Sequence, residues 1–151
     1  MTNETLHTLE TRRSCRAYKP EQITKEELEA VLRAGTFAPS AMNRQSAKIV
    51  VVQDAATRAQ LVVLADANAR CGVQDGSLVM GNLMNAAAAI GLGSCWINRA
   101  KEEFETEEGK ALLKKWGIEG DYIGVGHCIL GYPAEEPQPA APRKPDYIVY
   151  A

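Results

Sequence analysis

The 151-residue sequence is poor in the side chains that build metal sites and redox dithiols, since it contains four cysteines and two histidines. No CxxC pair occurs and no histidine cluster accompanies the cysteines, which argues against a zinc site or a redox dithiol. We therefore expect reduced thiols in a cytosolic protein. The four cysteines are Cys15, Cys71, Cys95 and Cys128.

An excess of charge and a long apolar run are also missing. Seventeen basic and nineteen acidic side chains leave a formal net charge of -2, which provides no overall field for nucleic acid or an anionic membrane. Any anion site must therefore be local. The longest apolar run, AAAAIGLGSCWI, is too short to cross a bilayer, and MTNETLHTLE does not resemble a secretory signal. These features predict a cytoplasmic protein.

Phosphate-binding signatures of the GxGxxG and GxxxxGKS types do not occur, which argues against the common nucleotide folds. Local patterns instead predict an α+β fold in one domain, residues 1–151. The most distinct helix start is a capping box formed by Thr24 and Glu27. The predicted helices are residues 3–13, 24–36, 74–90 and 107–117, and the predicted strands are residues 48–53, 61–66, 94–98 and 122–132.

The C-terminal part has a different composition. Five prolines between Pro133 and Pro145, with few apolar residues among them, predict an extended arm rather than packed structure. The arm is followed by DYIVYA, residues 146–151, which has the pattern of a strand. Such a strand could pair elsewhere, for example on another subunit.

The segment TRRSCR places three arginines and a serine within six positions, where the first predicted helix gives way to a loop. A phosphate monoester carries a charge of roughly -1.5 to -2 and three acceptor oxygens, which suits several guanidinium groups and one hydroxyl. Arginines at a helix C-terminus can equally interact with the helix dipole and remain solvated. The segment alone leaves both interpretations open.

Two further segments carry groups that a flat polar ligand could use. In APSAMNRQ, Asn43 and Gln45 each offer a donor and an acceptor, as needed to read the edge of a pyrimidine-like ring. Polar residues of this kind are also common in ordinary turns. In IGLGSCWI, two glycines would let the backbone approach a ligand closely, or would form a plain helix C-cap.

Together and in this order, these segments resemble the FMN-dependent nitroreductase family. The resemblance rests on TRRSCRAYKPEQITKEELEAVLRAGTFAPSAMNRQ, on GNLMNAAAAIGLGSCWI, and on ILGYP with the later PRKP, and it covers nearly the whole chain. It implies a central, mostly antiparallel sheet flanked by helices. It also implies that the C-terminal arm, residues 133–151, and its strand are exchanged with a partner subunit.

The resemblance further implies a homodimer with FMN at the subunit interface, where the helix from Gln74 forms part of the contact. The residues that it places at the phosphate are Arg12, Arg13, Ser14 and Arg16, joined by Arg143 and Lys144. Those that it places at the ring, from the partner subunit, are Pro39, Ser40, Ala41, Met42 and Asn43, with Gln45 behind them. Those that it places near the reactive face are Gly91, Leu92, Gly93 and Ser94.

The implied activity is that of an NAD(P)H oxidoreductase. NADH or NADPH reduces FMN, and a nitroaromatic, quinone-like or other small electrophilic acceptor then takes the electrons. We find no catalytic triad, carboxylate pair or metal cluster in the sequence, and we interpret His127 and Cys95 as structural residues. A flavin-binding storage or sensing protein and a phosphate-binding module without flavin stay open as alternatives.

The sequence departs from the family pattern at three places. Met42 stands where a small residue is common, and SAK follows Gln45 where proline and an aromatic residue are common. The chain is also shorter than the family pattern around residues 54–61, where the family carries a helix and a loop over the flavin; this is either a natural deletion or a missing mobile lid. The first two departures bear on pocket shape, and the third weakens prediction of the acceptor and favours the storage or sensing alternative.

Overall fold

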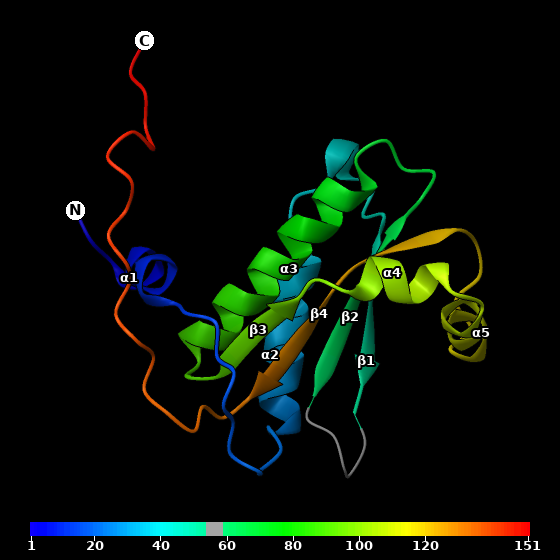
Figure 1. Cartoon of the computed structure of the whole chain (residues 1–151), viewed down its shortest axis with the longest axis horizontal. Helices are drawn as coiled ribbons and strands as arrows, with labels where there is room; N and C mark the ends of the chain where they lie inside the picture. The colour runs from blue at the N-terminus through cyan, green and yellow to red at the C-terminus, as the bar shows by residue number, and fades with distance from the viewer. Residues whose placement is uncertain (54–58) are drawn as a thin grey trace.

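A computed structural model describes residues 1–53 and 59–151 of the chain. Within these residues, one antiparallel sheet of four strands lies in the order β1-β2-β4-β3, with helices on both faces (Figure 1). Its strands are β1 (Ala47–Val52), β2 (Gln60–Asp66), β3 (Gly93–Ile97) and β4 (Tyr122–Gly131). All three neighbouring pairs run antiparallel, so the predicted α+β class and sheet direction are confirmed.

Strand β2 supplies side chains to a core on each face of the sheet. Leu61 and Val63 are completely buried on the face covered by the helices α2 and α3, and Val62 and Leu64 are buried on the opposite face. Because successive side chains of a strand point to opposite faces, a strand buried on both faces becomes continuously apolar. This explains the run LVVLA in the sequence.

The helices of the first face are α2 (Lys25–Thr36) and α3 (Gly72–Ala89). The predicted capping box is present, because Thr24 Oγ1 accepts from the Glu27 N–H (3.2 Å) and the Thr24 N–H donates to the Glu27 carboxylate (2.8 Å). Helix α3 begins two residues before the predicted start. The helices approach closely at Gly35 of α2, where an added Cβ would lie 2.6 Å from Leu83, whereas Gly81 of α3 has open space around it.

The helices of the second face are α4 (Ala100–Glu105) and α5 (Glu107–Lys115). The sequence analysis missed α4, which is short and mostly polar, and which buries Ala100 and Phe104. Its start lies so close to β4 that a Cβ at Gly124 would collide with the carbonyl oxygen of Ala100. Tertiary packing against a glycine of the sheet therefore stabilises a helix that has little local signal.

His127 and the buried cysteines lie within the packed body of the protein. His127 is 5% exposed, and its Nε2 lies 2.8 Å from a Glu103 carboxylate oxygen while its Nδ1 lies 2.6 Å from the Gln60 amide nitrogen. Cys95 and Cys128 are buried, and burial raises the pKa of the Cys128 thiol to about 12. These surroundings agree with the structural interpretation of His127 and Cys95.

The two ends of the chain extend from the same side of the sheet (Figure 1). Helix α1 (Glu4–Thr11) buries none of its residues, and its apolar side chains Leu6 and Leu9 are exposed. The arm begins as predicted after β4, where the Ala134 N–H donates to the Ala17 carbonyl (3.0 Å). Residues 146–151 are exposed and form no strand within the described chain. Among the described residues, no helix is long and apolar enough to cross a membrane.

The segment in which we expect the sequence to be shorter than the family pattern is residues 54–61, of which residues 54–58 lie outside the described residues. Ala59 is buried, and Gln60 and Leu61 are the first residues of β2.

Candidate functional site

An open cleft with a volume of about 1510 Å³ lies between α1, the C-terminal half of α3 and the first part of the arm. Its walls bring together two of the three segments singled out from the sequence. The predicted site residues that line it are Arg12, Arg13, Ser14, Arg16, Gly91, Leu92 and Gly93. The arginine segment and the glycine turn are therefore neighbours, although about 80 residues separate them in the sequence.

Backbone contacts hold the arginine segment against the outer edge of β3. Ser14 forms an isolated parallel bridge with Ser94, and the Cys15 N–H donates to the Ser94 carbonyl (2.8 Å). The approach is so close that a Cβ at Gly93 would lie 2.7 Å from the Cys15 sulfur. Gly93 is therefore required for the two segments to meet, and Ser94 lies next to the cleft although it does not line it.

The arginines carry donors that the protein itself does not satisfy. Arg13 Nη1 donates to the carbonyls of Glu10 (2.8 Å) and Arg12 (2.6 Å), but Arg13 Nε and Arg12 Nη1 are buried without a hydrogen-bond partner in the described part of the chain. The buried Ser94 hydroxyl also has no hydrogen-bond partner in the described part of the chain. Leaving a buried donor unpaired costs about 1–3 kcal/mol, more when it is charged. A ligand rich in acceptor oxygens, such as a phosphate monoester, fits this donor set.

The glycine turn ends α3 in a defined backbone geometry. Gly91 has a φ of 81°, and the Leu92 N–H donates to the Ala87 carbonyl (2.8 Å). An L-residue with a side chain is strained in this conformation, which explains the glycine. The turn is thus a helix C-cap, as the simpler interpretation of the sequence proposed, and it also lines the cleft.

The third predicted segment, APSAMNRQ at residues 38–45, forms a turn around the short 3₁₀ element η1 (Ala41–Asn43). The turn extends over residues 39–46, of which residues 39 and 42–45 are exposed. Met42, Asn43 and Gln45 have φ values of 54°, 53° and 51°, in the left-handed region. Such a conformation costs roughly 1–2 kcal/mol for a residue with a side chain, less for asparagine. Met42 is also 84% exposed, so the turn presents an apolar side chain to solvent in a strained backbone.

One buried carboxylate holds this turn in place. Asp75, in the first turn of α3, is 4% exposed and accepts from the Ala41 N–H and from the Ser46 hydroxyl, both at 3.0 Å. A further hydrogen bond runs inside the turn, from the Gln45 N–H to the Ser40 hydroxyl (2.9 Å). Sequence analysis missed Asp75; the available signal was a single acidic residue among the small and apolar residues of α3.

Within one chain, this turn and the arginine segment do not meet. The turn contacts the first turn of α3, whereas the arginines lie beside the glycines that follow its last turn. Helix α3 has 18 residues, so its ends are about 27 Å apart at 1.5 Å per residue. Pro39, Ser40 and Gln45 border a separate pocket of about 390 Å³, and Ala41, Met42 and Asn43 line neither cavity.

The remaining predicted residues, Arg143 and Lys144, lie in the exposed arm and do not line the cleft. The described residues contain no cluster of histidine, cysteine and carboxylate side chains that could hold a metal ion. The cleft is lined by three arginines and also by Glu4, Glu135 and Glu136. The unpaired donors on Arg12 and Arg13, rather than a net positive charge, therefore favour an anionic ligand.

Comparison with known proteins gives consistent matches over the chain. The model of a family described as "Nitroreductase family" matches residues 9–70 and 65–132. A protein of Archaeoglobus fulgidus named "Putative NADH dehydrogenase/NAD(P)H nitroreductase" is 33% identical over 155 residues, covering 88% of this chain and 87% of its own. A protein of Methanothermobacter thermautotrophicus with the same name is 25% identical over 166 residues, covering 96% and 85%.

Solved structures match the fold over its whole length. A nitroreductase with bound FMN from Bacteroides fragilis superposes with a TM-score of 0.90 at 25% identity, covering 99% of this chain and 100% of the other. A nitroreductase with bound FMN from Desulfitobacterium hafniense has a TM-score of 0.89 at 22% identity, with complete coverage of both chains. At the latter identity the likeness concerns the fold alone.

Proposed function

Because the chain belongs to the nitroreductase family, we propose that it is an NAD(P)H-dependent oxidoreductase that binds FMN in the cleft beside α3. The observation that carries the proposal is the pair of buried donors on Arg12 and Arg13 at this cleft, which have no hydrogen-bond partner among the described residues. FMN ends in a phosphate monoester, whose oxygens can satisfy these donors. The Bacteroides fragilis nitroreductase of the same fold holds FMN.

Each element of the cleft has a part in binding the cofactor. Arg12 and Arg13, with Ser14 and Arg16 at the rim, would hold the phosphate through charge-assisted hydrogen bonds. Gly91 would allow the backbone to approach the flat ring system, because the space at its Cβ position is open, whereas the corresponding space at Gly93 is filled by Cys15. Arg143 and Lys144 would add phosphate contacts if the arm folds toward this end of the cleft.

FMN, when bound, supplies hydride transfer, so the protein needs no nucleophile or acid-base pair of its own. The residues of the cleft would bind and orient the cofactor, with the arginines at its phosphate. We propose a nitroaromatic, quinone-like or other small electrophile as the acceptor and NADH or NADPH as the donor. Residues 1–151 would act as one domain, and the four free cysteines suit a reducing cytoplasm.

We propose further that two copies of the chain share each FMN. The turn of residues 39–46 lies too far from the arginines to reach a ligand bound by the same chain. A second copy could bring its own turn to the cleft. The face of α3 that the fold leaves uncovered suits such an interface, because it carries the exposed Val73 and Leu78 and the open position at Gly81.

The C-terminal residues support the same assembly. Tyr147, Ile148, Val149 and Tyr150 are between 67% and 92% exposed, which is unfavourable for large apolar side chains in an isolated chain. Strand β1 has an outer edge without a neighbouring strand in the described residues, next to the apolar pocket of about 390 Å³. Residues 146–151 of a second copy could pair with this edge and cover the pocket.

Alternating substitutions test this exchange. In a strand, Tyr147 and Val149 face one side, and Ile148 and Tyr150 face the other. We expect one of the double variants Tyr147→Ser/Val149→Ser and Ile148→Ser/Tyr150→Ser to dissociate the dimer much more readily than the other in analytical ultracentrifugation. Equal effects of both pairs would contradict strand pairing, and a monomeric wild type would contradict the dimer itself.

The function is tested by the absorbance spectrum of the purified protein between 300 and 550 nm, supplemented with FMN and then reduced anaerobically. We expect flavin bands that bleach with NADH or NADPH and return on addition of a quinone or nitroaromatic acceptor. Bands that do not bleach with either nucleotide would instead support a storage or sensing protein. Failure to bind FMN would refute the proposal.

A further inference from the structure

We propose that Asp75 is a positioning residue for the reaction, which holds the turn of residues 39–46 in the conformation that meets the flavin of the partner subunit. The inference rests on the proposed function, because it takes this turn as the second half of the FMN site. It assigns a role to a residue outside both the cleft and the resemblance that identified the other site residues.

The geometry shows a clamp rather than a single contact. The two carboxylate oxygens of Asp75 accept from different ends of the turn, the Ala41 N–H and the Ser46 hydroxyl, each at 3.0 Å. Between these two attachment points lie all three residues with a left-handed backbone conformation, Met42, Asn43 and Gln45. A strained backbone persists only where its surroundings hold it, and here both ends are held by one side chain.

The position of Asp75 suits this role electrostatically. Its carboxylate is 4% exposed, and no ion pair to a lysine, arginine or histidine occurs for it among the described residues. It lies in the first turn of α3, where the helix dipole favours a negative charge. The charge is thus stabilised by the helix and by two donors that belong to the turn, so both hydrogen bonds are charge-assisted.

The clamp also determines which polar atoms the turn presents. Gln45 Nε2 donates a hydrogen bond to the side-chain oxygen Oδ1 of Asn43 (3.3 Å). Because Asn43 Oδ1 accepts this hydrogen bond, the N–H₂ group of Asn43 is directed away from Gln45 Nε2. Loss of the clamp would release the strained backbone, and Asn43 would lose a defined direction.

The test compares FMN-loaded full-length variants with the wild type, which is measured first. For Asp75→Ala we expect kcat/KM for the nucleotide to fall about 10- to 100-fold, because small displacements of a positioning group have effects of this size. We also expect a shifted visible spectrum of the bound FMN, while FMN remains bound through the arginines. Asp75→Asn should rescue both, since its amide can accept from Ala41 and donate to Ser46.

A matched control separates positioning from stability. Glu27→Ala removes a carboxylate that caps the N-terminal end of α2, whereas the turn of residues 39–46 follows the C-terminal end. This carboxylate accepts hydrogen bonds from the Thr24 N–H and the Tyr132 hydroxyl. The substitution should lower the melting temperature while leaving the flavin spectrum and kcat/KM unchanged. If Asp75→Ala does not fold, Ser46→Ala removes one attachment and should give a smaller decrease in kcat/KM with the same spectral shift.

The outcomes distinguish this inference from the proposed function. A wild type that does not bind or reduce FMN would overturn both. An active wild type with Asp75→Ala or Ser46→Ala showing an unchanged spectrum and kcat/KM would overturn the inference alone. The inference alone would also be overturned if Glu27→Ala reduced kcat/KM as strongly as Asp75→Ala did.

Discussion

The two ends of α3 carry the two halves of the candidate site, and they are built in opposite ways. At the C-terminal end, Arg12 and Arg13 line a wide cleft and keep buried donors without partners in the described chain. At the N-terminal end, Asp75 accepts hydrogen bonds from both ends of the turn of residues 39–46. The backbone of that turn is strained, however, and the Met42 side chain is exposed. One end has unpaired hydrogen-bond donors, and the other has an uncovered surface.

This difference shows what each end requires. Unpaired charged donors require acceptor oxygens, which an anionic ligand can supply. An exposed apolar side chain on a fixed turn requires contact with a flat or apolar surface. Within one chain, the turn cannot contact a ligand held by the arginines, because α3 holds the two ends of the helix about 27 Å apart. A ligand together with a second copy of the chain would satisfy both.

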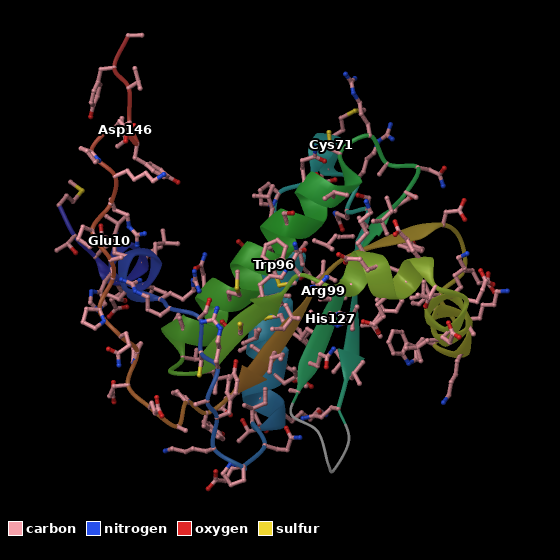
Figure 2. All side chains as sticks on the ribbon, viewed as in Figure 1. Glu10, Cys71, Trp96, Arg99, His127 and Asp146 are labelled. Atoms are coloured by element: carbon pink, nitrogen blue, oxygen red, sulfur yellow. The ribbon has the colours of Figure 1, made fainter. Side chains whose placement is uncertain are left out.

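The largest effect should come from breaking the C-terminal end. We expect Arg12→Ala/Arg13→Ala to weaken FMN binding about 100-fold or more, since each hydrogen bond to a charged group contributes about 1.5–3 kcal/mol. Fluorescence titration with FMN measures this change. The control is Arg99→Ala, whose arginine lies at the start of α4 (Figure 2). This arginine is exposed, and its one ion pair among the described residues is with Glu102. A change below about threefold for the double variant would contradict the assignment of the phosphate site.

An intermediate effect should come from the shape of the backbone at the same end. Gly91→Ala places a side chain at a φ of 81° and should lower the free energy of unfolding by about 1–2 kcal/mol. Gly117, after α5, has a φ of 72° and, like Gly91, has no atom within 4 Å of its Cβ position. Gly117→Ala should therefore cost similar stability.

These two variants differ in distance from the cleft, and denaturant unfolding together with FMN titration separates their effects. We expect only Gly91→Ala to reduce FMN affinity, because its turn lines the cleft. Equal FMN affinities of the two variants would show that the glycine turn contributes only to stability.

The smallest effect should come from a substitution at Glu27, which leaves both halves of the candidate site unchanged. Hydrogen bonds from the Thr24 backbone and from the Tyr132 hydroxyl lower the pKa of Glu27 below its ordinary value of 4.5. A carboxylate with a lowered pKa in the folded state stabilises the protein above its unfolded pKa, and this contribution is lost as the pH falls through the folded value.

At about pH 6 to 7, the free energy of unfolding of the wild type should exceed that of Glu27→Gln by a constant amount. Below pH 4.5 this difference should shrink, because the wild type loses the contribution of the Glu27 carboxylate. Urea unfolding across this pH range measures the trend, with FMN affinity at neutral pH as the check that the site is untouched. A difference that does not diminish in acid would show that Glu27 does not act through its charge.

Much of the fold follows from short-range patterns. The Thr24 and Glu27 capping box depends on contacts within a few residues, and the apolar run of β2 is visible in its local composition, so the sequence predicts both directly. The helix α4 is the exception, since its six residues are stabilised by Ala100 and Phe104 packing on the sheet. Its local signals are the spacing of these two side chains on one helical face and the charge pairs Arg99–Glu102 and Lys101–Glu105, which are weak in so short a segment.

The candidate site divides in the same way. The arginine segment and the glycine turn were recognisable because positively charged side chains and glycines have strong local meaning. Asp75 was not, because an aspartate in the first turn of a helix is commonly explained by the helix dipole. Its function depends on Ala41, 34 positions away, and nothing in either local sequence specifies that contact.

The sequence by itself determined the elements, the family to which the chain belongs, and which segments carry the polar groups of the site. Tertiary structure alone decided that the arginines have unpaired donors, that Asp75 clamps the turn, and that the two halves lie at opposite ends of one helix. The physical reason is range. Backbone dihedrals, capping and side-chain periodicity act over a few residues, whereas burial and the distance between segments exist only once the sheet and α3 have packed.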